Sequence, residues 1–136
     1  MQTGGAGNRI RSGVALILDT NLRLELKKDA AASASEPEFH VDFVDWTPDG
    51  ETTAPATTRG ALSASADAVI LDAPGSYNPR REPIYIAIHN KDTASHTFTV
   101  KTDDGTTERI IFKKAIEAGG TLQYNRQLGW YREAVV

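Results

Sequence analysis

Residues 83–101, PIYIAIHNKDTASHTFTVK, carry the clearest structural signal in the chain. In the first half every second residue is isoleucine, and in the second half Phe98 and Val100 alternate with threonine. This period of two is typical of β-strands that bury one face. We therefore predict a β-hairpin in which Ile88 pairs with Phe98 and Ile86 with Val100, because this register puts the large apolar groups on one side.

The same alternation recurs on both sides of this stretch. Asp103-Asp-Gly105 is a strong hairpin turn signal, but the tight turn and the best apolar register of the returning strand differ by one residue, which predicts a β-bulge. These short alternating stretches, which are separated by turn residues, predict an all-β fold. We expect an antiparallel β-sandwich of jelly-roll or immunoglobulin-like type with seven to eight strands. The further expected strands lie at residues 22–27, 39–46, 68–71, 109–113, 121–124 and 129–132.

Residues 47–66 consist mostly of Thr, Ala, Ser, Gly and Pro, and we expect a loop there with at most one irregular edge strand. The shared period of two also predicts the hydrophobic core. We expect it to contain Leu22, Leu24, Phe39, Val41, Phe43, Ile84, Ile86, Ile88, Phe98, Val100 and Leu122, with Trp130 at its edge.

Two segments are expected: residues 1–20 as a flexible N-terminal arm and residues 21–136 as a single β-sandwich domain. The first thirteen residues contain four glycines and almost nothing apolar, whereas residues 14–18 are too apolar to be left in water. We therefore expect the arm to become ordered against a partner. The candidate partner-binding residues are Arg9, Arg11, Val14, Leu16, Ile17 and Leu18.

Composition disfavours several classes of function. The formal net charge of -3 is the opposite of what binding to a phosphate backbone needs, so nucleic acid is not an expected partner. The longest strongly apolar run, residues 14–18, is far shorter than the roughly 20 residues of a membrane span. There is no cysteine to form a disulfide or a thiolate metal site. We expect a soluble protein that is made in the cytoplasm.

The sequence also offers no catalytic or metal-binding constellation. The predicted hairpin register places His89 and His96 on opposite faces, and His40 and Asp42 share a strand face but provide only two ligands. Asp42 and Asp45 fall on opposite faces, which disfavours a paired-carboxylate site. We therefore predict no enzymatic activity, no cofactor and no metal, and we expect the basic pairs at 27–28, 80–81 and 113–114 to be solvated.

Three strings resemble a recurrent pattern in small structural proteins of tailed bacteriophages. They are FHVDFVDW at residues 39–46, IHNKD at residues 88–92, and GTLQY at residues 120–124 followed by Gly129-Trp130. The resemblance spans residues 22–132 and implies a virion protein without catalytic residues. A capsid decoration protein on the outer head surface is our first choice, with the major capsid protein or other virion proteins as partners and a homo-oligomeric state.

Two alternatives stay open. The first is a head-tail connector or tail component of the virion. The second is a carbohydrate-binding β-sandwich module, because aromatic side chains can stack on sugars. The residues that could form such a platform are Trp46, Tyr77, Tyr85, Tyr124, Trp130 and Tyr131.

Overall fold

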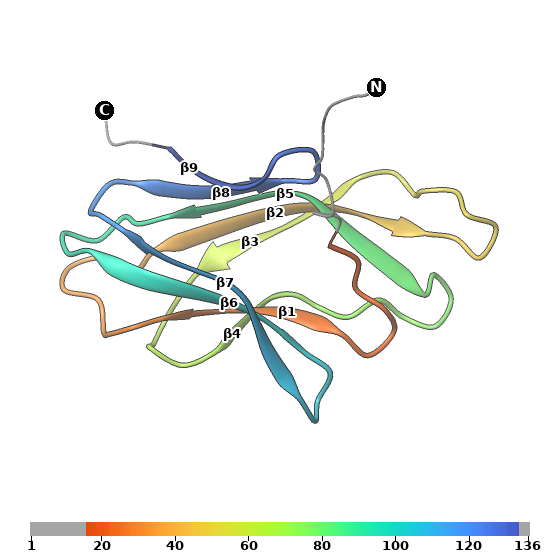
Figure 1. The fold of residues 1–136 in the computed structure, drawn as a ribbon, viewed down its shortest axis with the longest axis horizontal. Coiled ribbons are helices and arrows are strands. Elements are labelled where there is room, and N and C mark those ends of the chain that lie inside the picture. Colours follow the sequence, from red (N-terminus) through yellow and green to blue (C-terminus); the bar gives the residue numbers. More distant parts are fainter. Residues whose placement is uncertain (1–15, 134–136) are drawn as a thin grey trace, which may run out of the picture.

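The computed structural model describes residues 16–133, which form nine β-strands and no helix. The strands lie in two antiparallel sheets that pack against each other as two layers (Figure 1). The predicted β-sandwich is therefore confirmed, with nine strands in place of the expected seven to eight. The strands are β1 (Arg23–Lys28), β2 (Glu38–Trp46), β3 (Ala56–Ala61), β4 (Ala68–Leu71), β5 (Arg80–His89), β6 (His96–Asp103), β7 (Glu108–Ile116), β8 (Thr121–Asn125) and β9 (Gly129–Glu133).

The four-stranded sheet has the order β4-β1-β6-β7 and the five-stranded sheet the order β3-β2-β5-β8-β9. The predicted hairpin between β5 and β6 is wrong, because the two strands belong to different sheets. Ile86 and Ile88 of β5 and Phe98 and Val100 of β6 do face the same core, but from opposite layers. The connecting corner is held by the Asn90 side chain, whose Nδ2 donates hydrogen bonds of 2.9 Å to the carbonyl oxygens of both Ala94 and Ile116.

The bulge predicted on the strand after Asp103 is confirmed. Val100 lies opposite Phe112, whereas the next residue of β6, Lys101, lies opposite Ile110. Ile111 is therefore the extra residue of β7. The β6–β7 hairpin turns through Gly105, whose φ of 92° is a left-handed conformation that glycine adopts without a steric penalty.

The core contains most of the predicted residues, with Phe39, Phe43, Leu22 and Trp130 at its margin. Ile84 is the exception. Asp42 lies opposite Tyr85 and Phe43 lies opposite Pro83, so Ile84 has no partner on β2 and is only half-buried. The buried hydrophobic residues are Leu18, Leu24, Leu26, Val41, Val44, Leu62, Ile70, Leu71, Ile86, Ile88, Phe98, Val100, Ile116, Leu122 and Tyr124.

Two basic side chains expected at the surface are in fact enclosed. The Lys28 side chain is fully buried, with its Nζ 3.0 Å from Glu36 Oε1. The Arg81 guanidinium donates to both carboxylate oxygens of Asp45, at 2.7 and 3.1 Å, and lies 4.5 Å from the centre of the Phe43 ring. Periodicity could not reveal this, because both residues follow the pattern of solvated charged pairs.

Candidate functional site

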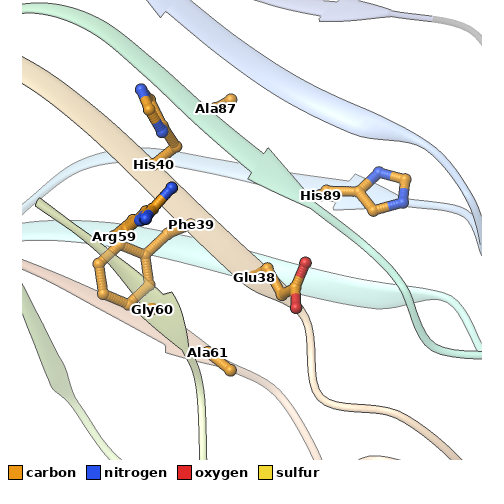
Figure 2. Close-up of a pocket in the computed structure, with 8 residues that line it drawn as sticks. All are labelled: Glu38, Phe39, His40, Arg59, Gly60, Ala61, Ala87 and His89. Atoms are coloured by element: carbon orange, nitrogen blue, oxygen red, sulfur yellow. The ribbon is translucent and has the colours of Figure 1, made fainter. Parts of the chain in front are cut away.

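The outer face of the five-stranded sheet, which points away from the core, carries an open hollow of about 540 Å³. We call it the Ala87 hollow. It is lined by Glu38, Phe39, His40, Arg59, Gly60, Ala61, Ala87 and His89 (Figure 2). Its residues come from β2, β3 and β5, which are neighbours in the sheet.

The hollow lies where two alanines, Ala87 on β5 and Ala61 on β3, stand among longer side chains. Residues directly opposite each other in a ladder share a face, so His40 on β2 and Gln123 on β8 flank Ala87 across the sheet. Along β5, the residues on the same face are Tyr85 and His89. Of these four neighbours of Ala87, His40 and His89 line the hollow.

Charged and polar groups stand at both ends of the hollow. Arg59 lies directly opposite His40, and Glu38 lies directly opposite His89. Figure 2 shows Arg59 and His40 side by side, Glu38 toward His89, and the short Ala87 between the two histidines. The hollow is thus bordered by two imidazoles, one guanidinium and one carboxylate.

Hydrogen bonds fix the orientation of both imidazole rings. His40 Nε2 donates to Asp42 Oδ1 at 2.9 Å, and the same oxygen accepts a hydrogen bond of 2.7 Å from Thr57 Oγ1. His89 Nδ1 lies 2.9 Å from Thr121 Oγ1. The prediction that His40 and Asp42 share a strand face is therefore confirmed. Within residues 16–133, the second nitrogen of each ring makes no hydrogen bond.

The two charged side chains of the hollow, Arg59 and Glu38, make few interactions with other residues. Within residues 16–133, the Arg59 guanidinium makes no hydrogen bond or ion pair. Glu38 has only a long ion pair of 3.4 Å with Lys91 Nζ, and both side chains are about half exposed, at 52% and 54%. Such exposed pairs contribute little to stability, so these groups can exchange partners when a ligand arrives.

His96 forms a second cluster, buried at the end of the sandwich where β6 begins. Its Nε2 lies 2.7 Å from Asp92 Oδ2 and its Nδ1 lies 3.1 Å from Asp29 Oδ1. Burial opposes the charged form of the ring, but the hydrogen bonds to the two carboxylates outweigh it and raise the pKa of His96. An imidazolium that donates from both nitrogens cannot take a proton from a nearby hydroxyl, so its geometry is that of a structural link and not of a catalytic base.

Asp92 is the centre of that link. Its carboxylate accepts hydrogen bonds of 2.8 Å from the backbone N–H groups of Ser33 and Ala34. The Ser33 hydrogen bond and the one from His96 hold the pKa of Asp92 well below its usual range. Asp92 therefore joins the β1–β2 connection to the corner between the two sheets. As expected, His89 and His96 do not converge, since His89 is exposed on the outer face.

An acidic cluster lies near the β6–β7 turn, where oxygen atoms of Glu25, Asp103 and Glu108 lie within 4.8 Å of one another. Two side-chain cations already bind it. Arg23 lies 2.8 Å from both Glu25 and Asp103, and Lys101 Nζ lies 3.0 Å from Glu108. We therefore treat the cluster as an ion-pair network and not as a metal centre.

Strand β7 presents a second type of surface. It is nine residues long and forms one edge of the four-stranded sheet. Ile110 is 63% exposed and Ile111 is 38% exposed, next to the exposed lysines 113 and 114. An edge strand with unpaired main-chain groups and exposed apolar side chains is a template for pairing with another chain. Sequence reasoning placed this strand but not its position at the edge.

The predicted partner-binding residues divide into three groups. Arg9, Arg11 and Val14 lie outside the described residues. Leu16 packs at the margin of the core and Ile17 is 39% exposed.

Leu18 is buried in the domain's own core. Its backbone exchanges two hydrogen bonds of 2.8 Å with Arg81. The expectation that Leu18 is covered by a partner is therefore wrong, and the described domain begins before residue 21.

No protein-family model, curated protein or solved structure matches this chain significantly. None of the described segments forms a helix long and apolar enough to cross a membrane.

Proposed function

We propose that this protein is a non-enzymatic structural component of a bacteriophage virion, and that it acts as a capsid decoration protein on the outer head surface. The resemblance of the three sequence strings to tailed-phage structural proteins suggests this class. The observation that carries the proposal is the exposed edge strand β7, which offers a binding surface suited to assembly.

The edge supports binding through two kinds of contact. Its main chain can add a strand from a partner to the sheet, and Ile110 and Ile111 can bury apolar surface against the same partner. The lysines at 113 and 114 and the bulge at Ile111 limit unspecific pairing between copies of the edge. A capsid protein or another virion protein would be the partner. Arg9, Arg11 and Val14 remain proposed additional contacts.

The placement of the edge agrees with a protein that coats a particle. Strand β7 belongs to the four-stranded sheet, whereas the Ala87 hollow lies on the outer face of the five-stranded sheet. The two sheets form separate layers (Figure 1), and buried residues of both make up the core. A partner bound along β7 would therefore leave the hollow accessible.

A binding assay with particles that lack this protein tests the proposal. Purified wild-type protein should sediment with the particles, and an Ile110→Lys/Ile111→Lys variant should stay in the supernatant. Val69→Lys is the matched control, because Val69 is 43% exposed on β4, the opposite edge of the same sheet. Equal sedimentation of the wild type and the double variant would refute the role of β7.

A further inference from the structure

We propose that the Ala87 hollow binds an acidic saccharide, with the Arg59 guanidinium holding the sugar carboxylate and His40, His89 and Glu38 holding hydroxyl groups. This site is separate from the assembly surface on β7 and does not depend on the virion proposal.

The shape suits a small ligand. The volume of about 540 Å³ lies within the range of about 300–1,000 Å³ that small-molecule sites occupy. The hollow spans β2, which has β3 on one side and β5 on the other. Its base is therefore anchored in hydrogen-bonded ladders on both sides, which gives it the fixed geometry that a binding site needs.

The charged groups select the ligand. Arg59 is the one charged side chain lining the hollow that has no ion-pair or hydrogen-bond partner within residues 16–133. A guanidinium binds a carboxylate through two parallel hydrogen bonds, which makes it the natural partner of a planar anion. At the other end, the half-exposed Glu38 carboxylate can accept hydrogen bonds from hydroxyl groups.

The polar groups are oriented before a ligand arrives. Asp42 holds His40, and Thr121 holds His89. The His40 ring packs edge-on to Tyr85, with 6.3 Å between the ring centres. Because the two imidazoles are already fixed, binding loses little of their side-chain entropy.

The lining also disfavours a protein partner at this position. The large exposed hydrophobic side chains of residues 16–133 are Ile17, Val69, Tyr77, Ile110, Ile111 and Leu128, and none of them lines the hollow. A protein interface normally has an apolar centre. Hydroxyl-rich ligands need the opposite, a concave surface with several fixed donors and acceptors.

Isothermal titration of the full chain with tetragalacturonate tests the site, with a neutral galactose tetrasaccharide and sodium acetate as comparison ligands. We expect binding of tetragalacturonate alone. Arg59→Gln should weaken it about tenfold or more, because a charge-assisted pair is lost. Ala87→Leu should weaken it at least as much, because the larger side chain fills the hollow. Arg109→Gln, which removes an exposed arginine on β7, should have no effect.

The unfolding midpoint of each variant shows whether it is folded. Since Arg59 and Ala87 face away from the core, both midpoints should stay near that of the wild type. If one variant fails to fold, the other still decides the question. The proposal is overturned if tetragalacturonate does not bind the wild type, if the neutral sugar or acetate binds equally well, or if a folded Arg59→Gln or Ala87→Leu variant binds like the wild type.

Discussion

Replacing two isoleucines of the same strand should have clearly different effects on stability. Ile86 and Ile84 are two residues apart on β5, and strict alternation would give them the same burial. Ile86 is fully buried, whereas Ile84 lies at the bulge opposite Asp42 and Phe43 and is half-buried. Ile86→Ala and Ile84→Ala are therefore the same chemical change in two environments.

The expected losses follow from the carbons that are removed. Ile→Ala deletes three carbon groups at about 0.8 kcal/mol each when they are buried, or about 2.4 kcal/mol. The cavity left at Ile86 adds about 1 kcal/mol, which gives a loss of about 3–4 kcal/mol. Ile84 is only partly buried and does not pack against the core cluster, so less transfer energy is lost and solvent can fill the space that opens. We expect a loss of about 1 kcal/mol there.

Equilibrium unfolding in urea, followed by the fluorescence of Trp46 and Trp130, measures both values. A domain of this size has a stability of about 5–15 kcal/mol, so both variants should remain folded without denaturant. The dependence of the unfolding free energy on urea should be unchanged, because the exposed surface on unfolding is nearly the same. Equal losses in the two variants would show that β5 has no bulge at Ile84 and would refute the described register.

Three further predictions concern other parts of the sandwich. Leu18→Ala should lower the unfolding free energy, measured in urea, by about 2–5 kcal/mol, because Leu18 is buried in the core. An unchanged value would instead support the expectation that Leu18 binds a partner. Gly105→Ala should lower the unfolding free energy by about 1–2 kcal/mol, because the φ of Gly105 is 92°. Gly75 has open space around it and no positive φ, so Gly75→Ala should leave the unfolding free energy unchanged. Equal effects of the two substitutions would contradict the turn geometry. The raised pKa of His96 means that its stabilising contribution is complete below the unfolded value of about 6.5 and is lost as the pH rises through the folded pKa. Unfolding midpoints between pH 5 and 9 should therefore fall with rising pH in the wild type more than in His96→Gln, and parallel curves would oppose the imidazolium assignment.

The sequence predicts which residues face the core much better than it predicts which strands are neighbours. Alternation identified Ile86, Ile88, Phe98 and Val100 as inward-facing, and all four are buried. The short connection between them suggested a hairpin, but the chain crosses to the other layer at Asn90. The crossing depends on contacts such as Asn90 with Ile116 and Asp92 with Ser33, which join residues far apart in the chain and leave no local pattern.

The Ala87 hollow could be predicted from the sequence even less than the strand order. Its histidines and Glu38 belong to strands that were predicted, but Arg59 comes from a segment rich in Thr, Ala and Ser that was expected to be mostly loop. That segment contains β3, which pairs Arg59 with His40. The site therefore depends on register across three strands, and no local pattern in the sequence specifies such a register.

The composition of the assembly that contains this chain tests the central proposal most directly. Quantitative mass spectrometry of purified particles should find the chain together with the major capsid protein and in many copies per particle. A copy number as small as that of a single ring would favour the head-tail connector, or another tail component, over the decoration protein. If the chain is found only free of particles, or in a complex without virion proteins, the proposed structural role is contradicted.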